Sequence, residues 1–206
     1  MRRWLTFFLI LACLVGQARG QVEMVTQVPT LGAATVGDVA VLSNTVADSS
    51  AIANTLTETA FSQSFTVAAN TLDIGRVLHV VAMGKYSTTA TPTLKFTLRW
   101  GGVNTNPLLF SSGAMVTASG AANLGWTVDV YVTVRTVGAS GTAVGGGFAL
   151  VAGAASTAGV VGTDSTASTT TIDTTAATAL TLFATWGAAS ASNTLLMEQF
   201  IVEELG

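Results

Sequence analysis

Residues 125–136, with the sequence GWTVDVYVTVRT, alternate between apolar and polar side chains. Successive side chains of a β-strand point to opposite faces of the sheet, so this alternation predicts a strand with one dry and one wet face. The stretch therefore favours a fold built from sheets. The side chains expected on the dry face are Trp126, Val128, Val130, Val132 and Val134.

Several other segments carry strand signals and are separated by turn residues. Residues 59–67 alternate in the same way, and residues 76–86 are apolar on both faces, as in a central strand of a sandwich. In residues 93–100 the side chains expected to point inward are Leu94, Phe96, Leu98 and Trp100, and those expected outward are Lys95, Thr97 and Arg99. Further strands are expected at 108–110, 142–151, 169–173, 179–186 and 194–205, with loops at 87–92, 115–123 and 153–168.

Charged residues make up only 9% of the 206 residues, whereas about 25% is typical. Abundant threonine and valine with so little charge favour an all-β fold, an antiparallel sandwich or barrel of about eight strands. Residues 194–205 could also form a helix, but a last strand fits better beside the others. Scarce charge further predicts that part of the surface is buried against other copies of the chain.

Residues 1–20 have the layout of a secretory signal peptide. Two arginines precede an apolar run over residues 4–15, and small residues stand at positions 18 and 20. The run is shorter than the roughly 20 residues of a transmembrane helix. A retained membrane leader and a misassigned start codon are the alternatives. Cleavage would make the protein exported or extracellular.

Cys13 is the only cysteine and lies inside this leader. The sequence ILAC around it partly resembles a lipoprotein box, so lipidation at Cys13 is a further alternative. If the leader is removed, the mature chain forms no disulfide, binds no zinc through thiolates and has no cysteine nucleophile.

The balance of charge argues against nucleic acid as a partner. Three of the eight Lys and Arg lie in the leader, which leaves five basic against eleven acidic groups. These five are spread along the chain, so no basic patch is expected to neutralise phosphates. They are Arg76, Lys85, Lys95, Arg99 and Arg135.

Residues 21–53 are small, polar or aliphatic, and they contain no aromatic residue. We expect an extended arm with one strand near Val39 to Leu42; a disordered linker is the alternative. Such an arm leaves backbone groups unpaired, so we expect it to be ordered by pairing with a neighbouring subunit. Residues 54–206 are then the β-sandwich domain.

Residues 54–102 contain TET, a Phe-containing strand, ANTLDIG, GKYS and TPTL, and residues 132–142 read VTVRTVGASGT. In these features the chain resembles a module of tailed-bacteriophage virion proteins. The resemblance implies a jelly-roll-like β-sandwich, a structural role in the particle and a homo-oligomer, a trimer or larger. The leader is foreign to phage structural proteins, which leaves a secreted or surface-displayed relative as the alternative.

His79, the only histidine, lies in an apolar segment between Val77 and Val81. A general base needs a nucleophile and an orienting partner nearby, so we interpret His79 as structural and predict that no hydrolase or transferase activity depends on it. The sequences GASGT and MGKY lack the spacing of a nucleophile elbow and of a phosphate loop. GTAVGGG, at residues 141–147, is expected in a hairpin strand rather than in a nucleotide loop.

The acidic and aromatic residues also give no site. Asp164 and Asp173 are nine residues apart without the alternating acids of a calcium loop. The C-terminal acids Glu198, Glu203 and Glu204 could form a carboxylate pair but are expected to be exposed. The three tryptophans outside the leader could line a sugar-binding groove but are expected in the core. They are Trp100, Trp126 and Trp186.

The sequence thus predicts no catalytic, cofactor-binding or metal-binding residue and no enzyme. The favoured function is a structural subunit of a virion or extracellular assembly, which associates with copies of itself through sandwich faces and the N-terminal arm. The alternative is an exported binding module, an adhesin or a carbohydrate-binding protein. Other particle or cell-surface proteins are further candidate partners, and the membrane is one only through a retained leader.

Overall fold

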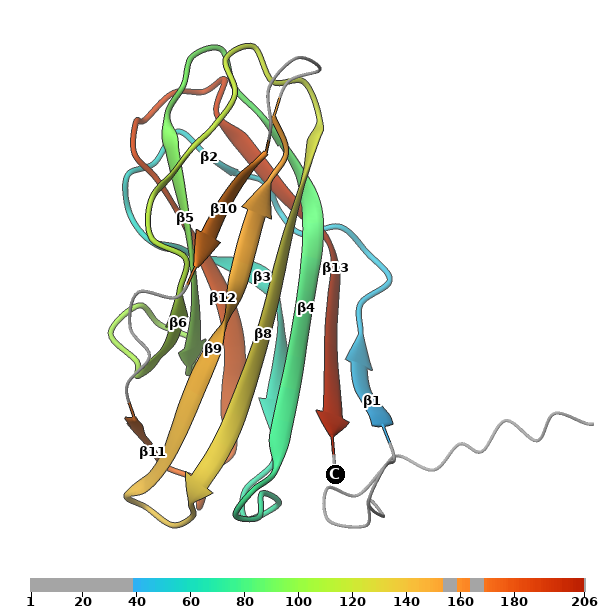
Figure 1. Ribbon diagram of the computed structural model, residues 1–206, viewed down its shortest axis with the longest axis vertical. Coiled ribbons are helices and arrows are strands. Elements are labelled where there is room, and N and C mark those ends of the chain that lie inside the picture. Colours follow the sequence, from blue (N-terminus) through green and yellow to red (C-terminus); the bar gives the residue numbers. More distant parts are fainter. Residues whose placement is uncertain (1–38, 154–158, 164–168, 206) are drawn as a thin grey trace, which may run out of the picture.

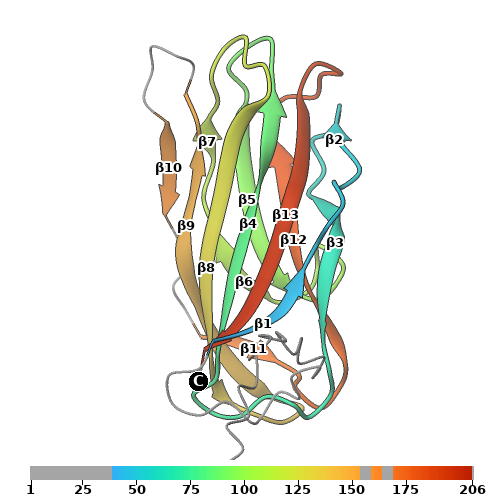
Figure 2. The ribbon, with the colours of Figure 1, turned by 90° about the vertical axis from the view of Figure 1, so that its right-hand side faces the viewer.

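The computed structural model describes residues 39–153, 159–163 and 169–205. The expected leader, residues 21–38 and Asp164 lie outside these ranges. Within them the protein is all-β, with one sheet of eight strands and one of five, and every pair of strands is antiparallel. None of the described residues forms a helix that could cross a membrane. Figures 1 and 2 show the two sheets as layers.

The alternating segments identified in the sequence form the long strands. The strands are β1 (Val39–Asn44), β2 (Ile52–Ala53), β3 (Thr59–Val67), β4 (Val77–Ser87), β5 (Thr93–Trp100), β6 (Leu108–Ser111), β7 (Met115–Val116), β8 (Leu124–Thr136), β9 (Gly141–Val151), β10 (Val160–Thr163), β11 (Thr170–Ile172), β12 (Thr178–Trp186) and β13 (Thr194–Leu205). The last segment is a strand and not a helix, as expected.

The order of the strands is that of a jelly roll. The larger sheet contains β1-β13-β4-β8, and β9 and β10 extend it beyond β8; the smaller sheet has the order β3-β12-β5-β6. If these eight strands are numbered along the chain, the two orders become 1-8-3-6 and 2-7-4-5, the arrangement of a double-sheet jelly roll. The jelly-roll-like sandwich expected from the sequence is confirmed.

One hydrophobic core lies between the two sheets. The inward side chains of β8 meet those of β5, and the ring centroids of Phe96 and Trp126 are 4.6 Å apart. Burial of each large apolar side chain contributes roughly 1.5–3 kcal/mol, so this layer supplies much of the stability. The residues expected there from the alternation are all buried: Leu94, Phe96, Leu98, Trp126, Val128, Val130, Val132 and Val134.

The three tryptophans expected in the core are buried there. Each indole N–H donates to a backbone carbonyl oxygen: that of Trp100 to Asp173, at 3.0 Å, that of Trp126 to Leu196, at 3.0 Å, and that of Trp186 to Ile52, at 3.2 Å. A buried indole N–H without an acceptor would be costly, so these bonds let the large rings enter the core. None of these three rings is exposed on an outer face of the sandwich.

The glycines of GTAVGGG lie in β9, as expected. A Cβ atom on Gly145 would come within 2.2 Å of the Leu109 carbonyl oxygen in the opposite sheet, and one on Gly147 within 2.1 Å of the Asp129 carbonyl oxygen in β8. Only glycine permits these close approaches of backbone to backbone.

Part of the expected arm belongs to the sandwich of its own chain. β1 pairs with β13, from Val39 opposite Leu205 to Asn44 opposite Ile201, and Figure 1 shows β1 beside β13. Residues 39–44 thus find backbone partners within their own chain along one edge, because β13 offers them a free edge. Leu42 packs against the core of its own chain.

Two expected loops contain short strands. Val160–Thr163, within the expected loop 153–168, forms β10 and pairs with β9. Met115–Val116 forms β7 and pairs with β5. Both segments are too short to show an alternation in the sequence. Pairing with the edges of β9 and β5 fixes them in place.

The register of β8 predicts opposite effects of acidic substitutions on its two faces. Val130 is fully buried, so Val130→Asp would bury an unpaired charge and should destabilise the fold by more than about 4 kcal/mol. Thr133 lies on the outer face, and Thr133→Asp should change stability by no more than about 0.5 kcal/mol. Thermal unfolding of both variants at low protein concentration measures this difference; equal losses would contradict the register.

Candidate functional site

The outer face of the larger sheet is apolar over most of its width. The register of the strands places five residues in one row across it: Val41 of β1, Glu203 of β13, His79 of β4, Tyr131 of β8 and Gly146 of β9. The row on one side is apolar except for Thr133, and the row on the other side is apolar except for Asn44 and Asp129. We call this surface the apolar face, and its outward apolar residues are Val39, Val41, Val77, Val81, Met83, Tyr131, Val144, Phe148, Leu150, Val161, Ile201 and Leu205.

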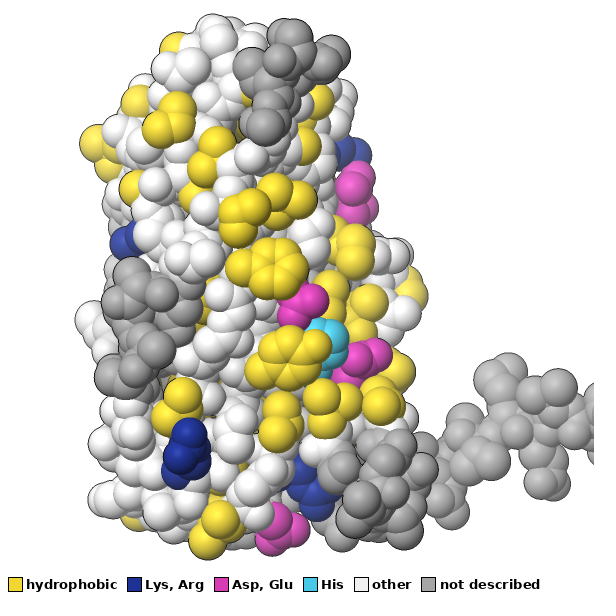
Figure 3. Space-filling model, viewed as in Figure 1, with side chains coloured by type: hydrophobic (Ala, Val, Ile, Leu, Met, Phe, Trp, Pro, Cys, Tyr) yellow, Lys and Arg dark blue, Asp and Glu magenta, His cyan; other side chains and the backbone are white. Residues whose placement is uncertain are grey.

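Several of these side chains remain largely exposed. The exposed fraction is 46% for Tyr131, 42% for Phe148, 59% for Val39 and 54% for Val41. Figure 3 shows the hydrophobic side chains gathered along this side of the molecule. A sheet that is apolar on both faces is normally covered on both, so a large exposed patch of this kind marks an interaction surface.

The charges at the centre of the apolar face are paired with one another. His79 Nδ1 lies 2.9 Å from Glu203 Oε2, and His79 Nε2 lies 3.1 Å from Asp129 Oδ1. The imidazole ring also stacks on Tyr131, with ring centroids 4.3 Å apart and an angle of 8° between the planes. We call these four residues the histidine cluster; Figure 3 shows its histidine between two acidic side chains.

The ring of His79 makes both of its polar contacts inside the histidine cluster. Both ring nitrogens of His79 face carboxylate oxygens, so neither faces a hydroxyl or thiol that it could activate. A neutral imidazole has one N–H, and the imidazolium has two, so only the protonated ring donates to both carboxylates. Among the residues that the structure describes, no group of three or more His, Cys, Asp or Glu could hold a metal ion.

A hollow lies on the same face, towards the end of β8 that is farther from the histidine cluster. Its volume is about 560 Å³, and its lining includes Gly84, Gly125 and Ala152. A Cβ atom on Gly125 would meet nothing closer than the Gly84 carbonyl oxygen, at 4.0 Å. We call it the glycine hollow; its other lining residues are Asp48, Met83, Trp126, Thr127, Leu150, Glu198 and Gln199.

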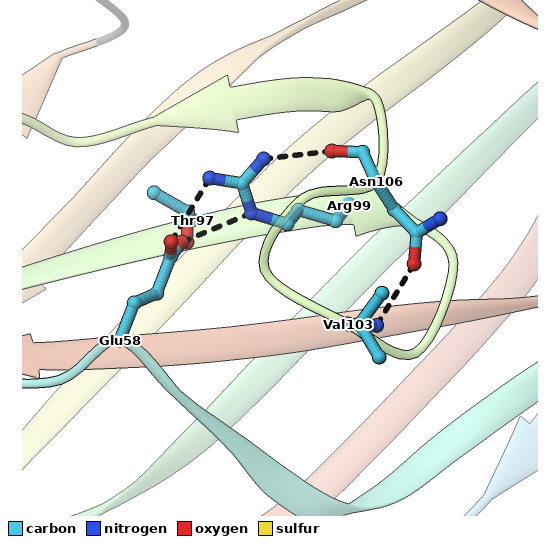
Figure 4. A network of polar contacts seen from close by, with 5 residues as sticks. All are labelled: Glu58, Thr97, Arg99, Val103 and Asn106. Atoms are coloured by element: carbon cyan, nitrogen blue, oxygen red, sulfur yellow. Dashed lines mark hydrogen bonds and ion pairs between the residues drawn. The ribbon is translucent and has the colours of Figure 1, made fainter.

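The outer face of the smaller sheet has a different character. Arg99 of β5 donates from Nε to Glu58 Oε1, at 3.0 Å, from Nη2 to Glu58 Oε2, at 2.9 Å, and from Nη1 to the Asn106 carbonyl oxygen, at 2.7 Å. Thr97 Oγ1 donates to the same Glu58 carboxylate. Figure 4 shows this network, in which the Asn106 side chain also accepts from the Val103 N–H. Thr97 and Arg99 point outward as expected, but this cover buries Thr97.

The expectation that the three C-terminal acids are exposed is wrong for Glu204. Only 2% of Glu204 is exposed, because it points inward from β13 and pairs with Arg76. Burial raises the pKa of Glu204 above its ordinary value, and the charge of Arg76 opposes that rise. Glu203 joins the histidine cluster, and Glu198 Oε1 lies 2.6 Å from Lys85 Nζ, so the three acids form no carboxylate pair.

The sequence held no sign of the histidine cluster as a unit. Asp129 and Glu203 lie 50 and 124 residues from His79, and only the order of the strands brings them together. A signal for the apolar face was present in residues 76–86, which are apolar on both sides. The Asp173 carboxylate accepts hydrogen bonds from the backbone N–H and the hydroxyl of Thr175 in a turn, and it belongs to none of the sites described above.

The Glu58 network predicts a loss of stability in acid. Burial alone would raise the pKa of Glu58, but hydrogen bonds from Arg99 and Thr97 and the charges of Arg99 and Lys95 together lower it below its ordinary value of 4.5. The ionised carboxylate therefore stabilises the fold above pH 4.5, and this contribution is lost as the pH falls through 4.5 towards the lower folded value. Denaturant unfolding of wild type and Glu58→Gln between pH 7 and 3 measures it; the variant should lose this part of the pH dependence, and an unchanged slope would contradict it.

Comparisons with known proteins add no relative. No protein-family model, no curated protein and no solved structure matches the chain. The relation to tailed-phage virion modules that residues 54–102 and 132–142 led us to expect stays a prediction. Function is therefore inferred from the exposed face of the larger sheet.

Proposed function

We propose that this protein is a non-enzymatic structural subunit that associates with copies of itself through the apolar face. The observation that supports this most directly is the row of exposed apolar side chains across the larger sheet. Burial of apolar area contributes about 25 cal/mol per Å², so a face of this kind favours association over exposure to water. Charged residues make up only 9% of the chain, so few charges would have to be buried in such an association.

The assembly that we propose is a virion or an extracellular array, with the protein as an oligomer of three or more copies. The jelly-roll order of the strands suits such a role, since capsid and lectin domains use it, but a fold carries many functions. The phage-like sequence features favour a virion. The signal-like leader favours an array outside the cell. The identity of the mature N-terminus, measured by mass spectrometry, separates these two settings.

A second candidate is a carbohydrate-binding or adhesive module, which Tyr131 and Phe148 favour because exposed aromatic rings can stack on sugars. Sugar sites combine such rings with several polar groups that fix the hydroxyls. Here Phe148 lies between Asp129 and Thr163 on the neighbouring strands, and Asp129, like the polar groups beside Tyr131, is already paired within the histidine cluster. Self-association therefore fits the apolar face better.

An acidic residue on the apolar face should weaken assembly. We expect Phe148→Glu and Leu150→Glu, made separately in the full chain, each to raise the dissociation constant of the assembly at least about tenfold, because an unpaired charge would be buried at the interface. Light scattering after size-exclusion chromatography over a range of concentrations measures the mass.

The matched control is Ser64→Glu, which places the same charge at an exposed position on β3 in the opposite sheet. It should leave the mass unchanged. Wild-type protein that remains monomeric at high concentration, or assembly that tolerates both acidic variants, would contradict the proposed function.

A further inference from the structure

We propose that two copies pack with their apolar faces together around a twofold axis that crosses the strands, so that Tyr131 of each copy fills the glycine hollow of the other. This inference rests on the proposed function, and it names the partner and the contact. The partner is a second copy of this chain. Four features of the apolar face support it.

The first feature is that Tyr131 is exposed and yet held in place. Its exposed fraction is 46%, and its ring stacks on His79, which two carboxylates fix from both sides. A side chain with a fixed orientation loses little conformational entropy when it enters an interface. Tyrosine is also enriched among the residues that dominate the binding energy of interfaces.

The second feature is that the hollow and Tyr131 lie on the same strand. Gly125 and Tyr131 both point outward from β8 and are six residues apart, which is about 20 Å along a strand. A twofold axis at the level of Val128, midway between them, exchanges their positions. Tyr131 of one copy then faces Gly125 of the other, and the same contact forms a second time.

The third feature is that the same axis pairs apolar residues on the neighbouring strands. On β9 it brings Phe148 opposite Leu150 of the other copy, and on β4 it brings Val81 opposite Met83, because the register places these residues at equal distances from the axis. An interface around a twofold axis must complement itself in this way.

The fourth feature is complementary charge. The axis that exchanges Tyr131 with Gly125 also exchanges His79 with Lys85. The reason is that His79 lies opposite Tyr131, and Lys85 opposite Gly125, in the pairing of β4 with β8. Lys85, which is paired with Glu198 in its own copy, therefore approaches the histidine cluster of the other, where Asp129 and Glu203 supply two carboxylates for one histidine. A shift along the strands would move the positive charge away from these acids, so the charges favour this register.

Cross-linking tests the proposed contact directly. Tyr131→Cys and Gly125→Cys are made separately in the full chain carrying Cys13→Ser, which removes its only other cysteine. Sheets packed face to face lie about 10 Å apart, too far for a disulfide, so a short bis-maleimide joins the two cysteines. An equimolar mixture should form a covalent dimer, seen on a denaturing gel, because cysteine at 131 of one copy faces cysteine at 125 of the other. Each variant alone should not, since like positions lie about 20 Å apart, beyond the reach of the linker.

A second variant tests the hollow without touching its occupant. Gly125→Phe fills the hollow from within its own chain, and the fold should tolerate it because the space is open and the φ of Gly125 is not positive. We expect the dissociation constant of the dimer to rise at least about tenfold. Gly102→Phe is the matched control, since nothing lies within 4 Å of a Cβ atom there and it belongs to the β5–β6 loop.

The outcomes separate this inference from the proposed function. Assembly of the wild type with no cross-link in the mixture, or with cross-links as strong in either variant alone, overturns the twofold contact and leaves self-association standing. Assembly that survives Gly125→Phe unchanged also overturns it. A wild type that stays monomeric throughout overturns both.

Discussion

The register of β8 between β4 and β9 is the constraint on which the rest of the molecule depends. With a side-chain period of two, this register sends the valines of β8 to the core and sends Gly125, Asp129 and Tyr131 outward. A slip by one residue would exchange these two sets, placing Asp129 in the core and removing the stack on His79. The core and the apolar face are thus two results of the same pairing.

The two outer faces of the sandwich differ in how they meet water. On the smaller sheet, Glu58 and Arg99 form a two-pronged ion pair that covers Thr97 with polar groups. On the larger sheet the charged groups at the centre pair with one another within the plane of the face, and several of the surrounding aliphatic side chains are exposed, as far as the described residues show. This asymmetry makes the larger sheet the side on which a partner gains most by binding.

The sequence predicted the sandwich well because alternation reports burial directly. The pattern correctly placed the inward residues of β5 and β8 in the core. It did the same for Trp100, Trp126 and Trp186. The short strand β10 could not be predicted, since its pairing depends on the position of β9. The sequence could not reveal the Arg76–Glu204 pair or the partners of His79, because their members are far apart in the chain and carry no local pattern. The apolar face could be anticipated only in part, from residues 76–86.

The position of β13 also governs the order in which the sheet can form. β13 is the last described strand along the chain, yet it lies between β1 and β4, which are made much earlier. During synthesis, β4 must wait with one edge unpaired, and β1 with no strand partner at all, until β13 emerges. Pairings between such distant segments carry a high cost in loop closure and make folding slow. Until β13 is made, contacts with other chains compete with β13 for the open edges of β1 and β4, so the nascent chain is at risk during this period.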